Sequence, residues 1–457
     1  MPPTMEEPKS AKILEVCRVA PQPELAAKQV SLPLTFFDIL WLRLPPAQLL
    51  FFYEFSHPRQ LFFDSVLPKL KKSLSLTLQH FIPLAGNINW LCHSTKPILN
   101  YTTGDAVLLT IAESDADFIH LSGTDLCDAI ESHPLIPHLA ISHEQASAFA
   151  LQVTLFPGSG FSIGIALHQV VVDGKTTASF MKSWGYISKF GARKSSSLLP
   201  PELTPFYDRT VIRDPTGIEE MFVKDWLKQG GPNNRSLMVW DLKIAQDAIR
   251  GVFELTRPDI EKLRQLVLTK LKLKVHLSTF TLICAYIWIC IVKAEELKTE
   301  NTVFVVTVDC RTRLDPPIPP TYFGNCVRGR PIVLKTKNLL GEDGFLVAVK
   351  ALSEALASLE DGVLSGAETW VSNLCKLSTD RRISIAGSPK FEIYSVDFGW
   401  GRPKKVEMSS IDQTRAVSLW DSRNGNGGIE VGLVLRKHDM EAFASLFTNG
   451  LRSPSKL

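Results

Sequence analysis

Short apolar segments alternate with longer amphipathic ones along the whole chain. Apolar residues of strand length fill Phe149–Phe156 and Phe161–Leu167, and a Pro-Gly-Ser-Gly turn separates the two segments, which predicts a β-hairpin. From Leu61 to Phe81 the apolar residues recur at helical spacing, which predicts an amphipathic helix that Pro68 either kinks or begins. Strands and helices are mixed in order, and this favours an α/β fold.

The same patterns predict the other elements. The first sixty residues are proline-punctuated and are predicted to be loop-like. The longest apolar run, 280–292, is about 20 Å long as a helix, too short for a bilayer, and predicts a buried core helix. We expect strands at 106–111, 250–255, 303–308, 391–397, 405–410 and 428–435, and helices at 176–189, 257–269, 278–297, 345–359 and 440–447.

Chain length sets the expected number of domains. A chain of 457 residues is longer than one hydrophobic core usually organises, so two domains are expected. Between 191 and 205 the sequence is rich in Lys, Ser, Leu and Pro and has no periodicity. We therefore predict an N-terminal domain at 1–190, a crossover at 191–215 and a C-terminal domain at 216–457.

Composition excludes several classes of protein. Hydrophobic residues make up 45% and charged residues 21%, which excludes a largely disordered chain. Fifty basic and 47 acidic residues leave a formal charge of +3, so no nucleic-acid partner is indicated. Eight cysteines lie apart, without C-x-x-C pairs or zinc spacing, and predict neither a disulfide scaffold nor a metal site. The polar, acidic N-terminus lacks secretory features, and we expect a soluble cytoplasmic protein without membrane association.

Four polar clusters stand out against this background. The first, 168–177, joins an apolar strand to a helix, where polar groups are well placed for catalysis because rigid elements hold them. The simpler alternative is that Asp173 caps the helix and His168 is satisfied locally. The other clusters are turn-like when taken singly, since glycine and aromatic residues are common in turns. These three clusters are 308–317, 322–326 and 397–401.

Taken together, the clusters resemble motifs of the plant BAHD acyltransferases, which transfer acyl groups from coenzyme A thioesters to alcohols or amines. The resemblance runs from Leu32–Asp38 through Phe81–Gly86 to Gly427–Gly432. Tyr-Phe-Gly-Asn-Cys at 322–326 is similar to the branch that acylates anthocyanin and other flavonoid or phenolic glycosides. Asp-Gly-Lys-Thr-Thr at 173–177 and Ser-Val-Asp at 395–397 most resemble the malonyltransferases of that branch.

This resemblance implies a two-domain, chloramphenicol-acetyltransferase-like α/β fold. Each domain would hold a mixed β-sheet flanked by helices, and the active-site channel would lie at their interface. The implied co-substrate is an acyl-CoA, with malonyl-CoA preferred, and the implied acceptor is the sugar hydroxyl of a phenolic or flavonoid glucoside. No tightly bound cofactor and no metal are implied, and the chain is expected to be a monomer.

One position departs from the family motif, His-x-x-x-Asp. Counting back from Asp173, the catalytic histidine position holds Gln169, and a histidine survives one residue earlier as His168. Imidazole is a suitable general base, whereas a glutamine side chain cannot accept a proton at useful pH. His168 could substitute only if the junction is not extended, since neighbouring side chains of a strand point to opposite faces. Three alternatives stay open: an impaired acyltransferase, a catalytically silent relative that binds its ligands, and an engineered His-to-Gln variant.

The resemblance also suggests roles for the remaining polar residues. Asp173 would be a structural aspartate that pairs with Arg311. The motif at 397–401 would lie off the reaction centre, with a structural role that shapes the coenzyme A side; its members are Asp397, Phe398, Gly399, Trp400 and Gly401. Polar groups near the expected channel would contact substrate, and these are Thr35, Asp38 and Asn325.

Charged ligands need cationic partners. A malonyl group carries a free carboxylate that a cation should receive, and the candidates are Lys175 and Arg402. The alternative is that both are solvated surface charges. Coenzyme A phosphates suggest further basic candidates, namely Lys272, Lys274 and Lys293.

Overall fold

The computed structural model describes residues 10–22, 29–191, 199–230, 233–271, 277–375 and 381–452, and it contains three β-sheets. The first sheet has six strands, whose order is β1 (Lys12–Val19), β6 (Val107–Glu113), β9 (Phe149–Phe156), β10 (Gly160–Leu167), β3 (Ala47–Glu54) and β15 (Lys405–Met408). A smaller four-stranded sheet has the order β2 (Gln29–Pro33), β5 (Ile98–Thr102), β4 (Asn87–Asn89) and β8 (Gln145–Ser147).

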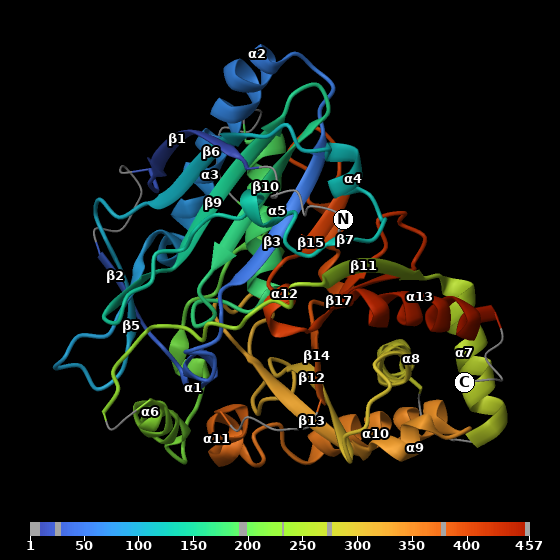
Figure 1. The fold of residues 1–457 in the computed structure, drawn as a ribbon. Helices are drawn as coiled ribbons and strands as arrows, with labels where there is room; N and C mark the ends of the chain where they lie inside the picture. Colours follow the sequence, from blue (N-terminus) through green and yellow to red (C-terminus); the bar gives the residue numbers. More distant parts are fainter. Residues whose placement is uncertain are drawn as a thin grey trace.

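The second large sheet has seven strands in the order β13 (Val327–Lys335), β12 (Asn301–Asp309), β14 (Arg381–Ala386), β16 (Val417–Asp421), β17 (Ile429–Arg436), β11 (Ala248–Leu255) and β7 (Cys127–Asp128). The two large sheets form two lobes, seen at the top and at the lower right of Figure 1. The described α-helices are α1 (Phe36–Ile39), α2 (Arg59–Leu61), α3 (Leu67–His80), α4 (Phe118–Ser122), α5 (Gly174–Phe190), α6 (Ile218–Lys228), α7 (Arg257–Leu271), α8 (Thr279–Ala294), α9 (Thr336–Leu340), α10 (Gly344–Ala357), α11 (Trp370–Cys375), α12 (Ile411–Thr414) and α13 (Lys437–Arg452).

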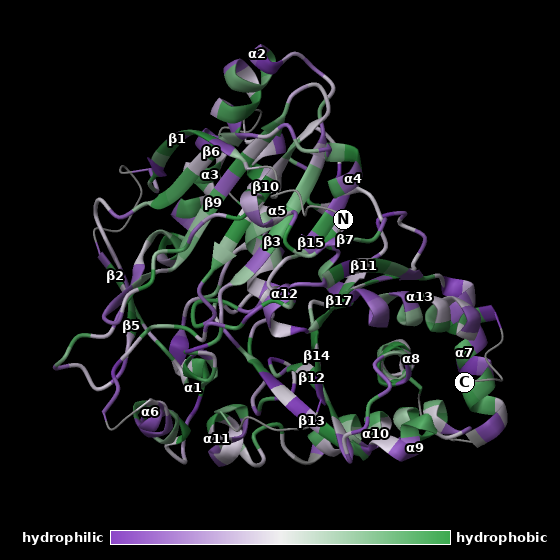
Figure 2. Cartoon of the chain, viewed as in Figure 1, coloured by the Kyte–Doolittle hydropathy of each residue, from purple (hydrophilic) through white to green (hydrophobic). Residues whose placement is uncertain are grey.

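The predicted hairpin forms the centre of the first lobe. β9 and β10 pair antiparallel, and every residue of both strands is buried. Figure 2 draws β10 in green and white, as expected for a strand covered on both faces. Helices α3 and α5 pack together, and the indole of Trp184 donates to Ser73 across their contact at 3.0 Å. Pro68 lies in the first turn of α3, after a π-helical turn at Phe62–Val66.

The second lobe is built around α8. This helix packs against α7, α10 and α13, and all its residues from Thr281 to Val292 are buried. The prediction of a buried core helix is therefore confirmed, and Ser278 caps its first turn. Among the helices of the described residues, none has the length and apolar character needed to cross a membrane.

Each large sheet takes a strand from the other half of the chain. β15 joins the first sheet beside β3, and β7 joins the second sheet beside β11. Buried Arg250 on β11 forms ion pairs with Glu407 on β15 and with Asp412 on α12. A single boundary at 191–215 therefore does not separate the two sheets, and the domain limits stay a prediction.

Two expectations about local structure are wrong. The opening is not loop-like, because β1, β2 and β3 lie within it; β1 is an edge strand with mostly exposed side chains, so its sequence lacks a strong apolar signal. The segment 391–397 is not a strand but contains two short 3₁₀ turns, Pro389–Phe391 and Ile393–Ser395. Glu392 has a left-handed backbone there, with φ of 46°, and the main-chain N–H of Ile393 donates to Asp421 at 2.7 Å.

Candidate active site

The candidate site is built on the turn between β10 and α5. After β10 ends, the N–H of His168 still donates to Ala148 at 3.1 Å, and the N–H of Val171 then donates to the His168 carbonyl at 3.0 Å. The chain therefore turns at 168–171, and the junction is not an extended segment. Asp173 is the N-cap of α5, where its carboxylate accepts from the N–H of Thr176 at 3.0 Å, as an N-cap aspartate does.

A buried ion pair joins this turn to the other lobe. Arg311, just after β12, lies 2.8 Å from the Asp173 carboxylate, and neither side chain is more than 1% exposed. The guanidinium also donates to the carbonyls of Tyr322 and Gly324, at 3.2 Å each. Burial alone would lower the pKa of Arg311, but the Asp173 carboxylate raises it above its usual value. Arg311 therefore stays charged and fastens the 322–326 segment to the N-terminus of α5.

A second buried carboxylate anchors the turn from the opposite side. Asp38 accepts hydrogen bonds from the N–H and the side-chain amide of Asn325, at 2.9 and 3.1 Å. The same amide donates to the main-chain carbonyl of Gln169 at 3.0 Å. Thr35 donates to the other Asp38 oxygen through its N–H and its hydroxyl, at 2.9 Å each. Asp38 thus bonds to both Thr35 and Asn325 beside the turn, and the expected contact of these three residues with substrate stays a prediction.

Arg209 also contacts Asp38, and it was not identified from the sequence. It lies in the predicted crossover. There the main chain of Phe206 bonds to that of Thr321 and of Phe323, so the crossover runs beside residues 321–323. The Nη1 of Arg209 donates to the Tyr322 hydroxyl at 2.6 Å and lies 3.4 Å from Asp38. The local sequence around Arg209 does not indicate that its side chain is buried, because the residues that pair with it, Asp38 and Tyr322, are distant in sequence.

Gln169 and His168 differ in exposure. Gln169 is half-buried, and its side-chain amide has no hydrogen bond to another described residue. His168 is fully buried, and its Nδ1 faces the N–H of Val170 at 3.4 Å. Burial lowers the pKa of His168 to about 4, an effect that the main chain of Leu237 partly opposes. His168 is therefore not accessible as a base, although the junction is not extended. Its imidazole is neutral at physiological pH.

The candidate cations lie in different surroundings. The ammonium of Lys175 is 3.2 Å from Asp309, and both side chains are partly exposed. Arg402 is exposed, on the short loop that precedes β15. Lys293 lies in the last turn of α8, whereas Lys272 and Lys274 fall outside the described residues. Neither Lys175 nor Arg402 has a contact with the hydrogen-bonded group of Thr35, Asp38, Arg209 and Asn325 among the described interactions.

The 397–401 motif lies against the first lobe as a tight turn. Asp397 accepts from the N–H groups of Gly399 and Gly401, at 2.7 and 3.0 Å, and pairs with Lys189 of α5 at 2.6 Å. Both glycines have positive φ, 102° and 105°, which a residue with a side chain would adopt only with strain. Phe398 is fully buried, and the Trp400 ring lies 4.6 Å from the ammonium of Lys69. None of these contacts involves the 168–171 turn, and the structural role of the motif on the coenzyme A side stays a prediction.

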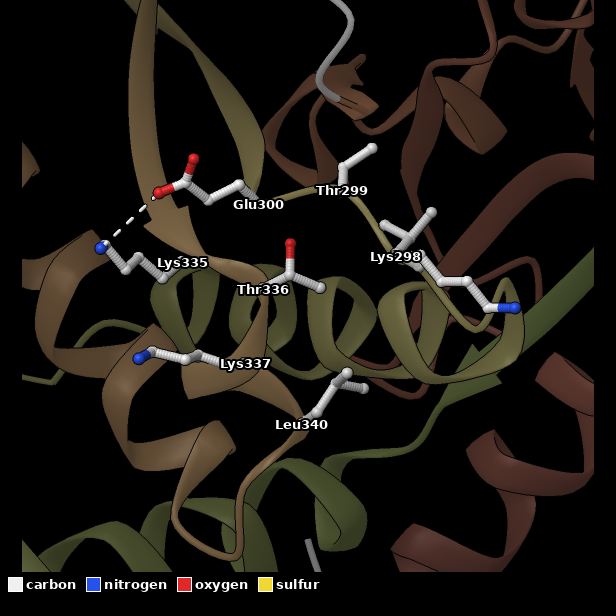
Figure 3. Close-up of a pocket in the computed structure, with 8 residues that line it drawn as sticks. Lys298, Thr299, Glu300, Lys335, Thr336, Lys337 and Leu340 are labelled. Atoms are coloured by element: carbon white, nitrogen blue, oxygen red, sulfur yellow. Dashed lines mark ion pairs between the residues drawn. The ribbon is translucent and has the colours of Figure 1, made fainter.

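A surface pocket of about 340 Å³ lies elsewhere, at the start of β12 (Figure 3). Lys298, Glu300, Lys335 and Thr336 are among its lining residues, and Lys335 pairs with Glu300 at 3.7 Å. The candidate site begins at the opposite end of β12, about 26 Å away at 3.3 Å per residue. The pocket is therefore separate from the site, and the channel expected between the lobes stays a prediction.

Among the described residues, the arrangement anchors the 168–171 turn but offers no accessible base. The carboxylates of Asp173 and Asp38 are saturated by donors, and His168 is buried. No group of three or more His, Cys, Asp or Glu side chains within the described ranges could hold a metal ion. What the turn offers is a rigid frame around residue 169.

Comparison with known proteins gives a family and close relatives. The model of the Transferase family matches residues 13–449. Phenolic glucoside malonyltransferase 1 of Arabidopsis thaliana is 39% identical over 465 residues, which cover 97% of this chain and 98% of that protein. Malonyl-CoA:anthocyanidin 5-O-glucoside-6''-O-malonyltransferase of the same plant is 40% identical over 468 residues, with 97% and 98% covered.

Solved structures give the fold. Vinorine synthase is similar with a TM-score of 0.72 at 19% identity, covering 96% of this chain and 98% of its own. F. graminearum TRI101, complexed with ethyl coenzyme A, has a TM-score of 0.68 at 13% identity, with 91% and 97% covered. The expected two-lobed, chloramphenicol-acetyltransferase-like α/β fold is therefore confirmed.

Proposed function

Since the chain belongs to the BAHD acyl-CoA-dependent acyltransferases of the Transferase family, we propose that it transfers malonyl groups from malonyl-CoA to phenolic or flavonoid glucosides. Acyl transfer follows from family membership, whereas the donor and the acceptor are the proposal. The observation that carries it is the similarity to two malonyltransferases of such glucosides along 97% of the chain. The name of the second relative, which malonylates the 6''-oxygen of an anthocyanidin 5-O-glucoside, points to a sugar hydroxyl as the acceptor.

The reaction would run directly between the two bound substrates. The acceptor oxygen attacks the thioester carbonyl, a tetrahedral intermediate forms, and the coenzyme A thiolate leaves without an acyl-enzyme. In this mechanism a base takes the acceptor proton, and its loss costs about 3–5 kcal/mol of transition-state stabilisation. The turn that would present residue 169 remains anchored at both ends by Arg311 and Asn325. These anchors support a site that binds its substrates and lacks only the base.

A second candidate is a relative that binds acyl-CoA or a phenolic glycoside without turnover. Gln169 is the observation that favours it, because an amide can hold a hydroxyl but cannot take its proton. An engineered His-to-Gln change would give the same behaviour, with an ordinary acyltransferase as the parent. The same experiment tests the silent relative and the engineered variant.

The test is an assay of free-thiol release from malonyl-CoA with a panel of phenolic glucosides, run for the chain and for Gln169→His. The histidine variant should raise kcat by about two decades with little change in KM, since a base acts mainly in the transition state. It should also introduce a pH–rate inflection in the imidazole range. His168→Ala is the matched control and should change little. Ligand binding without release by either protein would favour the silent relative, and absence of both would contradict the proposal.

A further inference from the structure

The titratable groups around residue 169 are all engaged or inaccessible. Asp173 accepts from Arg311, from Thr176 and from the N–H of Cys326, the last at 3.1 Å. These donors occupy both oxygens of the Asp173 carboxylate, so neither oxygen is free to accept a hydrogen bond from a substrate hydroxyl. Its side chain is only 1% exposed, so it also has no path to a substrate proton.

The Asp38 carboxylate is held in the same way. Its two oxygens accept from Thr35 and Asn325, and Arg209 lies 3.4 Å away. Its side chain has no exposed surface. Asp309 contacts both Arg311 and Lys175. Burial would raise the pKa of its carboxyl group, but Arg311 and Lys175 lower it.

The remaining groups are no better placed. His168 has no exposed surface and is neutral above about pH 4. The Tyr322 hydroxyl accepts from Arg209 and is buried, and burial raises the pKa of this phenol. Burial likewise raises the pKa of the Cys326 thiol. Cys310 and Tyr207 also contact the 322–326 segment, and burial raises the pKa of each. Within the described part of the chain, none of these groups is therefore free to remove a proton from a neutral alcohol.

We infer that this site acylates an acceptor that has already lost its proton to solvent, namely a phenolic hydroxyl of the glycoside rather than a sugar hydroxyl. The inference rests on the proposed function and deepens it: the acceptor is a glucoside that carries a free phenolic hydroxyl besides the glycosylated one, and that hydroxyl attacks in place of a sugar hydroxyl. An unperturbed phenol such as that of tyrosine has a pKa of about 10, so about 1% is ionised at pH 8. A sugar hydroxyl is a far weaker acid and is ionised much less.

The bond changes are those of ordinary acyl transfer. The proton of the phenol passes to water before attack. The phenolate oxygen then forms a bond to the thioester carbonyl carbon, and the carbon–sulfur bond breaks. The coenzyme A thiolate leaves and is protonated by water, so that no proton has to be stored on the protein. Gln169 can donate a hydrogen bond but need not accept a proton, which is compatible with a phenolate as the attacking group.

The experiment measures thiol release from malonyl-CoA with two series of acceptors that differ in phenol pKa: substituted phenols, and phenolic glucosides that carry a free phenolic hydroxyl. Rates without protein and without acceptor are subtracted. At pH 7, lowering the phenol pKa from about 10 to about 7 should raise kcat/KM by about ten- to hundredfold, because the larger ionised fraction outweighs weaker nucleophilicity. The pH–rate inflection should move with the pKa of the acceptor, and fragmentation mass spectra should place the malonyl group on the phenolic oxygen.

Two variants at one position sharpen the test. Gln169→Asn keeps an amide and should retain the dependence on acceptor pKa. Gln169→His supplies a base, so it should flatten that dependence and shift malonylation to the sugar oxygen. Sugar-acylated product from the unaltered chain, with a pH profile independent of the acceptor, would overturn this inference and leave the proposed function standing. If no acceptor supports release above background, the proposed function fails, and this inference fails with it.

Discussion

The side-chain amide of Asn325 donates a hydrogen bond to the main-chain carbonyl of Gln169 at 3.0 Å, across 156 residues of sequence. The same amide donates to the buried carboxylate of Asp38 at 3.1 Å. One side chain therefore ties the turn at 168–171 to α1 and to the 322–326 segment. Because the family motif predicts the catalytic position at residue 169 of this turn, its anchoring should affect both stability and turnover.

Asn325→Ala should lower the free energy of unfolding by about 1–3 kcal/mol, because it removes one buried and one partly buried hydrogen bond. In the Gln169→His background it should also lower kcat, since the base would sit on a less ordered turn. Asn100→Ala is a suitable control, because Asn100 accepts an exposed hydrogen bond from Ser31. Denaturant unfolding and thiol-release kinetics measure the two effects. Equal losses for the two variants would show that Asn325 does not anchor the turn.

Asp173→Asn should cost about 3–5 kcal/mol of stability, because it leaves Arg311 buried without its closest carboxylate. Activity should fall together with the yield of folded protein. The matched control is Asp309→Asn, since Asp309 contacts the same guanidinium at 3.1 Å but its side chain is 39% exposed. Exposed pairs contribute about 1 kcal/mol or less. An unaltered melting temperature for Asp173→Asn would contradict the structural role of the pair.

His168 should make the protein less stable in mild acid. Its pKa is lowered from 6.5 to about 4 in the folded chain, so the unfolded chain binds the proton first as the pH falls below 6.5. Stability is therefore full above pH 6.5 and is lost progressively towards pH 4, with about 2 kcal/mol lost by pH 5. In His168→Asn this loss should disappear, whereas His438→Asn, at a side chain 85% exposed, should keep it. Unfolding free energies at pH 7 and pH 5 check the difference.

Lys175→Ala should raise the KM for malonyl-CoA by about tenfold and leave the KM for acetyl-CoA nearly unchanged, if its ammonium receives the malonyl carboxylate. Arg402→Ala tests the other candidate cation by the same comparison of KM for malonyl-CoA and acetyl-CoA. Lys182→Ala is the control, because Lys182 pairs with the exposed Glu392. An equal change for both donors would reject the residue as the carboxylate receiver and leave the Lys175–Asp309 contact as a surface ion pair.

The strongest local patterns predicted their elements well. The hairpin of β9 and β10, the core helix α8 and the helix after Asp173 could be predicted because apolar periodicity and an N-cap residue are local properties of the chain. The motifs at 322–326 and 397–401 indicated the family for the same reason, since each is a continuous run of residues. The edge strand β1 and the turn at 391–397 could not be predicted, because exposed strand residues carry no apolar signal and an αL residue at Glu392 interrupts an apparently extended pattern.

The sequence by itself determined which residue stands at each motif position, including glutamine at 169. Only the tertiary structure decided what surrounds that position. Asp38, Arg209 and Asn325 are far apart along the chain, and their burial depends on donors and acceptors that folding brings together. The availability of a proton acceptor likewise depends on desolvation and on neighbouring charges. Those are properties of packing in three dimensions, and no local pattern of residues encodes them.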